Sequence, residues 1–279
     1  MQTLMFYSYK GGAGRTVAAA NVAAALAKLG KRVLIMDMDF EAPGLHTVFG
    51  VESTQKFKRR LGIQDYFRGN VKLRDVQDQI VINMADEKEV ENFFRIPKNS
   101  CLYYLIATPK SSVVFTGEAD HHRKMAELIN YLHEILTLDY IILDSASGIR
   151  DAFTLSIQPC DKIFIFFRWS KQHIEGTIRT VNLIRAMKGM EDGIFHPFKL
   201  VPSAVPGVEE LNKLGQLQSQ LLQGVRIQNL NKLQERCGED GELLNEIPEI
   251  TALKWQESVI VFNQNDTPYE KLANKILLM

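Results

Sequence analysis

The chain has 279 residues, and its 46% hydrophobic and 24% charged residues are an ordinary composition for a globular protein. Its 33 Lys and Arg residues balance its 33 Asp and Glu residues, so no overall attraction to nucleic acid is expected. The three cysteines lie far apart without a CxxC pair, so neither a disulfide framework nor a zinc or iron–sulfur site is supported.

The first thirty residues predict a strand, a glycine-rich turn and a helix. Residues 3–8 are an apolar run typical of a strand, and the alanine-rich residues 17–29 favour a helix that Gly30 would end. Glycines between them let backbone N–H groups curl toward an anion, and the helix N-terminus adds partial positive charge. We expect a phosphate-binding loop here, with the Thr16 hydroxyl on a magnesium ion and Arg15 against the phosphates.

The loop itself reads Tyr9-Lys10-Gly11-Gly12-Ala13-Gly14-Arg15-Thr16. The ordinary pattern G-x-x-x-x-G-K-[ST] fits it only at Gly14 and Thr16. From Lys10 to Thr16 it resembles the deviant loop K-G-G-x-G-K-[ST] of the ParA/MinD ATPases, and Arg15 makes it similar to a K-G-G-V-G-R branch of that family. The alternative is a tight glycine turn in an unrelated α/β protein. The resemblance implies nucleotide contacts from Gly11, Gly12, Ala13, Gly14, Arg15, Thr16 and Val17.

Residues 32–36 form a second apolar run, typical of a strand buried on both faces, and Asp37-Met38-Asp39 follows it. The two carboxylates would point the same way if the strand persists, at the carboxyl end where open α/β sheets bind ligands. The pair resembles the family's D-x-D motif, which implies that Asp39 positions the attacking water and that Asp37 supports the magnesium shell. Solvated loop carboxylates are the alternative.

Residues 51–100 are an insertion that shows little pattern. We expect a short helix over 86–94, a strand over 102–107 and a helix over 117–136. The insertion is basic, and its cations suit either a solvated surface, which we favour, or a patch for nucleic acid or an acidic partner. These cations are Lys56, Lys58, Arg59, Arg60, Arg68, Lys72 and Arg74.

A third apolar run, residues 140–143, delivers Asp144, and Gly148 follows four residues later. The stretch resembles the family's Walker B and switch region, D-x-x-x-G. It implies that Asp144 accepts hydrogen bonds from magnesium-bound water and that the Gly148 N–H senses the γ-phosphate. An aspartate that merely ends a buried strand is the alternative.

The remaining residues continue the alternation of strands and helices. We expect strands over 162–167, 198–201 and 259–262, and helices over 176–187, 209–222, 228–237 and 267–278. Residues 172–176 resemble a stretch of the same family branch, and the family's loop at Pro202 and Ser203 packs on the adenine ring. The closing helix has too few cations for a MinD-type membrane anchor, so we expect it to pack on the core, with no membrane anchor.

Together these features predict one α/β domain over residues 1–279, a P-loop NTPase with a mostly parallel sheet and helices on both faces. The resemblance implies an ATP- and Mg²⁺-dependent homodimer in which Lys10 reaches the partner's nucleotide. Slow hydrolysis would position an unknown protein partner or cargo, and non-specific DNA is a further candidate partner. Neither a signal peptide nor a membrane span is present, which favours the cytoplasm.

Two other functions stay open. The departure at Arg15 is compatible with a nucleotide-sensing scaffold that binds ATP but hydrolyses it little, because a planar guanidinium holds phosphate oxygens differently from an ammonium group. A metal-cluster carrier of the same fold is the other alternative, and the missing cysteine pair argues against it.

Overall fold

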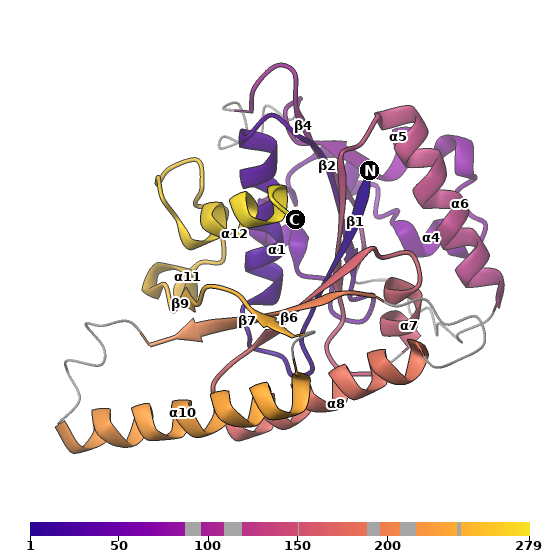
Figure 1. Ribbon diagram of the computed structural model, residues 1–279. Helices are drawn as coiled ribbons and strands as arrows, with labels where there is room; N and C mark the ends of the chain where they lie inside the picture. Colours follow the sequence, from indigo (N-terminus) through magenta and orange to yellow (C-terminus); the bar gives the residue numbers. More distant parts are fainter. Residues whose placement is uncertain (87–95, 109–118, 150, 189–195, 207–215, 239–240) are drawn as a thin grey trace.

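The computed structural model describes residues 1–86, 96–108, 119–149, 151–188, 196–206, 216–238 and 241–279. Its centre is a twisted sheet of strand order β3-β4-β2-β5-β1-β6-β7-β8, with β9 paired to β7 (Figure 1). All strand pairs are parallel except β3 with β4, which confirms the predicted fold class. The strands are β1 Gln2–Tyr7, β2 Arg32–Met38, β3 Val81–Asn83, β4 Cys101–Leu105, β5 Tyr140–Ser145, β6 Lys162–Phe167, β7 Phe198–Val205, β8 Glu242–Leu243 and β9 Ile247–Pro248.

Helices cover both faces of the sheet because the central strands are apolar on both sides. Alternate residues of one strand enter different cores: Leu4 and Phe6 meet α1 and α12, whereas Met5 and Tyr7 meet α7, α8 and α10. The second face continues under α4, α5 and α6. These helices are α1 Arg15–Lys28, α4 Ile63–Phe67, α5 Val76–Ile80, α6 Ala119–Leu136, α7 Asp151–Ile157, α8 Lys171–Lys188, α10 Gln216–Cys237 and α12 Pro268–Leu277.

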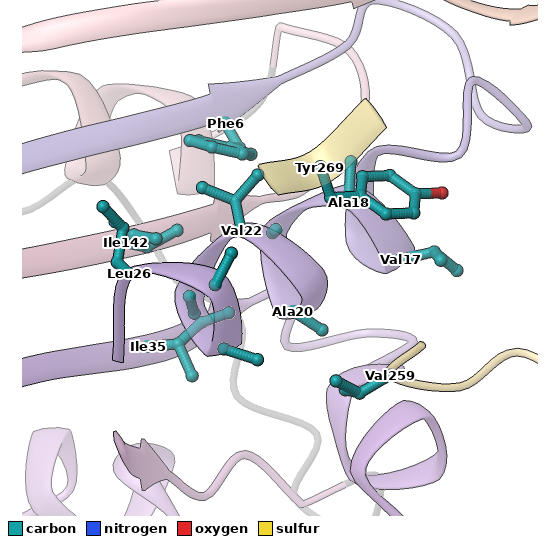
Figure 2. Packing of buried hydrophobic residues seen from close by; sticks show 14 of the residues in the cluster. Phe6, Val17, Ala18, Ala20, Val22, Leu26, Ile35, Ile142, Val259 and Tyr269 are labelled. Atoms are coloured by element: carbon teal, nitrogen blue, oxygen red, sulfur yellow. The ribbon is translucent and has the colours of Figure 1, made fainter. Parts of the chain in front are cut away.

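Helix α1 is buried along almost its whole length, with every residue from Val17 to Ala27 inside. Figure 2 shows Val22 and Leu26 beside Phe6 of β1 and Ile142 of β5. The small alanine side chains let the helix lie close to the sheet on one side and to α12 on the other. Gly30 ends the helix region with a positive φ of 87°, as expected from the sequence.

The closing helix packs on α1, as predicted. A capping box starts it, in which Thr267 Oγ1 accepts from the Glu270 N–H and the Glu270 carboxylate accepts from the Thr267 N–H. Glu270 also pairs with Lys28 at 2.7 Å, which joins the end of α1 to the start of α12. The apolar stripe of α12 is therefore buried, and no helix among the described residues is long and apolar enough to cross a membrane.

The insertion between β2 and β4 consists of short elements, which explains its weak sequence pattern. Besides α4, α5 and β3 it contains α2 Leu45–Phe49, α3 Gln55–Lys58 and the 3₁₀ turn Leu73–Asp75. Of its seven cations, Lys56 is half-buried and donates to the Val81 carbonyl at 2.6 Å, and the other six are exposed. The predicted helix over 86–94 falls almost wholly outside the described residues.

Several predicted boundaries were wrong. Strand β7 continues to Val205 rather than ending at Val201, and α8 begins five residues before Gly176. The helix expected over 228–237 is the second half of one helix, α10, which passes through the half-buried Gly224, since a single glycine costs a helix only about 1 kcal/mol. Residues 207–215, where a separate helix was expected to begin, lie outside the described residues.

The strand predicted over 259–262 is instead a buried turn held by one side chain. Asn21 of α1 accepts from the Ile260 N–H at 2.7 Å and donates to the Ser258 carbonyl at 3.0 Å. Asn21 is fully buried, so these bonds replace the ladder that a strand would have supplied. The apolar run was interpreted correctly as buried and wrongly as extended.

This contact makes Asn21 a test of how the C-terminal segment is attached. Asn21→Ala should lower the free energy of unfolding by about 2–4 kcal/mol. It leaves the Ile260 N–H and the Ser258 carbonyl without their hydrogen-bond partner, and each unsatisfied buried group costs about 1–3 kcal/mol. Urea unfolding followed by circular dichroism measures the change. Asn231→Ala, on the exposed face of α10, is the control and should change little. An unchanged midpoint in Asn21→Ala would contradict this role.

Candidate functional site

The glycine loop lies between β1 and α1, at the carboxyl edge of the parallel strands. Gly12 and Gly14 have φ values of 78° and 67°, a region that side chains disfavour, and Gly14 is the N-cap of α1. A Cβ placed on Gly11, Gly12 or Gly14 would meet nothing within 4 Å. Gly12 and Gly14 are therefore present for backbone conformation, and all three glycines leave the space in front of the loop open for an anion.

Ser203 fixes the loop from behind. Its hydroxyl donates to the Ala13 carbonyl at 2.6 Å, and both residues are buried. Ser203 belongs to β7, so this bond ties the loop to the strand two places away from β1 in the sheet. Pro202, its predicted companion, lies within β7 opposite Phe167 rather than in a loop, which corrects the sequence interpretation.

Two of the three predicted acidic site residues, Asp37 and Asp144, lie side by side. Asp37 of β2 and Asp144 of β5 are register partners on neighbouring strands, and each is only 1% exposed. The N–H groups of Asp39, Gly44 and Leu45 donate to the Asp37 carboxylate at 2.8–3.0 Å. The turn after β2 is thus wound around this carboxylate.

Burial dominates the electrostatics of this carboxylate pair. Burial and then the charge of Asp144 raise the pKa of Asp37, while its three N–H donors oppose the rise. Burial also raises the pKa of Asp144, and the nearby Arg15 charge opposes it. Such a pair is stable in its charged form only with a cation close by.

Arg15 supplies that cation. Its Nε donates to Asp144 Oδ1 at 2.6 Å, and its Nη1 and Nη2 lie 3.4 Å from the hydroxyls of Ser8 and Thr16. The side chain is only 9% exposed. Arg15 therefore engages the Asp144 carboxylate, a contact that the sequence does not predict, and its contact with phosphates stays a prediction.

Asp39 and Lys10 are less enclosed. Asp39 follows the last residue of β2, is half-buried, and accepts from the Ala42 N–H at 3.1 Å. Lys10 is exposed at the rim of the loop. Gly148 lies next to the start of the loop, since its N–H donates to the Ser8 carbonyl at 3.3 Å and its φ is 81°.

Tyr9, which stands in the place of a P-loop glycine, packs against helix α8. A Cβ on Gly176 would come within 2.1 Å of the Tyr9 ring, so α8 needs a glycine where the ring lies. This contact explains why the stretch 172–176 has a glycine at position 176. Sequence reasoning missed it because the two residues are far apart in the chain.

A cavity of about 200 Å³ opens beside the loop. The loop and α1 contribute Gly12, Ala13, Gly14 and Val17 to its lining. Arg168, which follows β6, and Ser203 and Ala204 of β7 also line it. Its remaining lining comes from the C-terminal segment: Ile247, Pro248, Glu249, Ile250, Leu253, Glu257 and Tyr269. No motif marks these seven residues, so only the folded chain identifies them. Their mixture of apolar and carboxylate side chains suits a planar polar ring.

Thr16 in the first turn of α1 and the two strand-end carboxylates also fit a magnesium ion. Thr16, Asp37 and Asp144 offer hard oxygen atoms, and Asp144 Oδ2 is buried with no hydrogen-bond partner among the described residues. The described part of the chain has no cluster of three or more His, Cys, Asp or Glu side chains arranged for a metal. Mg²⁺ needs only one or two protein carboxylates when phosphates and water complete its shell.

Comparison with known proteins finds relatives that include MinD proteins of several organisms. MinD, the septum site-determining protein, is 26% identical in Thermotoga maritima over 63% of this chain and 56% of the relative. The Synechocystis MinD is 27% identical over 64% and 58%. The chain thus matches less than two thirds of the length of these relatives.

Solved structures share the fold. The Aquifex aeolicus MinD cell division protein has a TM-score of 0.69 at 20% identity, covering 100% of this chain and 98% of that chain. The Pyrococcus horikoshii MinD complexed with Mg-ADP has a TM-score of 0.63 at 17% identity, with coverage of 99% and 95%. A family model described as AAA domain (AAA_31) matches residues 1–193, most of the chain. The chain therefore belongs to this AAA domain family, and its MinD relatives support membership of the ParA/MinD group.

Proposed function

We propose that residues 1–279 form a Mg²⁺-dependent ATPase switch that dimerises around its nucleotide and positions a partner or cargo. One observation carries the proposal: the open glycine loop, Thr16 and the buried carboxylates meet at one edge of the sheet, beside the cavity. MinD relatives and the Mg-ADP complex of a structural neighbour support a nucleotide-dependent positioning function at the family level.

Each residue then has a physical role. The N–H groups of residues 11–17 bind the phosphates, and the cavity takes the base next to Ser203. Thr16, Asp37 and Asp144 would hold Mg²⁺, which supplies charge neutralisation at the phosphates. Asp39 is half-buried beside this group, where a carboxylate would orient an attacking water. The Gly148 N–H, which donates to the Ser8 carbonyl, would turn to the γ-phosphate when nucleotide binds.

In the proposed dimer, Lys10 would contact the nucleotide of the partner subunit. An exposed lysine at the loop rim can extend away from its own subunit on a flexible stem. In a two-fold dimer the same contact occurs twice, once at each nucleotide. The neighbours include a MinC:MinD complex and a plasmid partition protein bound to AMPPNP, which support a partner-dependent cycle, with a protein or DNA as the partner.

A scaffold that binds ATP and hydrolyses it little is the second candidate. The observation that favours it is the engagement of Arg15 with Asp144, which occupies a proposed magnesium ligand. Turnover measured alone and with added DNA or partner protein separates the two candidates.

Asp39 tests the hydrolytic step. Asp39→Ala should keep ATP affinity within about twofold and lower turnover by about 100-fold or more, because water activation contributes 10²–10⁴ to rate and little to ground-state binding. Phosphate release and a fluorescent ATP analogue measure the two quantities. Glu41→Ala, an exposed carboxylate of the same loop, is the control. Parental turnover in Asp39→Ala would remove Asp39 from the mechanism.

Lys10 tests the dimer. With ATP and Mg²⁺, light scattering should show a dimer for Asp39→Ala and a monomer for Lys10→Ala/Asp39→Ala, while both bind ATP. Losing two charged contacts weakens the interface by roughly 3–6 kcal/mol, which moves a micromolar dissociation constant to between roughly 0.2 mM and 25 mM. Lys72→Ala/Asp39→Ala, altered at an exposed lysine of the insertion, should still dimerise. A dimer indifferent to Lys10 would contradict the trans contact.

A further inference from the structure

The Arg15 guanidinium contacts two of the three groups that suit Mg²⁺. It donates to Asp144 Oδ1 at 2.6 Å and lies 3.4 Å from Thr16 Oγ1, and a third contact at 3.4 Å reaches the Ser8 hydroxyl. Both partners of the ion pair are buried, with side chains 9% and 1% exposed. The guanidinium therefore contacts one carboxylate and two hydroxyl groups, and two of these three groups are proposed metal ligands.

The buried carboxylates need this positive charge. Asp37 and Asp144 are opposite each other on adjacent strands, and no other cation pairs with either of them among the described residues. Asp144 Oδ2 still has no hydrogen-bond partner in the described part of the chain, so the pair retains an acceptor for a further donor or a metal. Arg15 neutralises part of the charge and leaves that acceptor open.

We propose that Arg15 holds the place of the divalent cation while nucleotide is absent. On this proposal, Arg15 releases Asp144 and Thr16 to Mg²⁺ only when a phosphate group offers the guanidinium another anionic partner. The proposal rests on the nucleotide site described above. It makes Arg15 a positioning residue that couples metal binding to nucleotide binding.

The chemistry of arginine supports this exchange. A guanidinium is always protonated, so its charge cannot be lost inside the protein, and its planar fork matches the geometry of both carboxylate and phosphate groups. Moving it from Asp144 to a phosphate exchanges one charge-assisted contact for another. A Mg²⁺ ion that arrives alone offers no such anion, and it would have to displace a buried cation from its carboxylate.

Binding of Mn²⁺ to the nucleotide-free protein tests the proposal, because free Mn²⁺ is counted directly by electron paramagnetic resonance. At mildly alkaline pH, Arg15→Gln should bind Mn²⁺ at least about tenfold more tightly than the parent chain, since the competing charge is gone while the side chain still donates a hydrogen bond. Arg15→Gln/Asp144→Asn should lose this binding. Circular dichroism establishes that each variant is folded.

Arg32→Gln is the matched control. Arg32 also sits at a strand end with its guanidinium bonded, to the Leu136 carbonyl and the Tyr103 hydroxyl, but it lies at the opposite end of β2. Its variant should bind Mn²⁺ as the parent does. Equal Mn²⁺ affinity in the parent and Arg15→Gln, whether strong or absent, would overturn the proposal.

A separate titration distinguishes failure of the Arg15 proposal from failure of the proposed nucleotide-binding function. A fluorescent ATP analogue is titrated into the parent chain with Mg²⁺ present. Saturable binding together with equal Mn²⁺ affinities would reject only the role of Arg15. Failure of the analogue to bind would reject the nucleotide site itself, and with it the coupling.

Discussion

The burial of helix α1 is the constraint on which the other parts of the structure depend. Every residue from Val17 to Ala27 is inside, between the sheet and α12. An exposed glycine loop would be poorly fixed by its own sequence, but here it begins a helix that cannot shift without opening the core. Ser203 holds the Ala13 carbonyl from the other side. The loop is thus a flexible sequence made rigid by what surrounds it.

The same burial brings the C-terminal segment to the site. Asn21 of α1 fixes the turn at Ser258 and Ile260, and Lys28 pairs with Glu270 at the start of α12. The lining residues from β9 to Tyr269 are carried to the cavity by these contacts. On the proposed function, one helix would present its N-terminal N–H groups to the phosphates, and along its length it anchors the wall of the cavity. This arrangement links the stability of the core to the shape of the site.

The carboxyl edge of the sheet places charge where solvent cannot screen it. Asp37 and Asp144 are buried because parallel strands β2 and β5 end side by side under the loop. The free-energy cost of burying these two charged carboxylates is reduced by the N–H groups that donate to Asp37 and by the Arg15 charge beside Asp144. A lysine at this position would be a compact point charge, whereas Arg15 reaches Asp144, Ser8 and Thr16 together through one planar group. The arginine of this loop thus engages the Asp144 carboxylate as well as two hydroxyls at the loop.

The sequence by itself determined the parallel α/β fold, the glycine loop and the order of the strands' apolar runs, because these depend on local pattern: glycine spacing, alanine content and uninterrupted apolar residues. Only the tertiary structure decided which way Arg15 turns, since its partner Asp144 is distant in the chain. It also decided that residues 259–262 are a turn, because Asn21 supplies their hydrogen bonds. The cavity wall and the packing of Tyr9 on Gly176 likewise follow from contacts between remote residues, which no periodicity records.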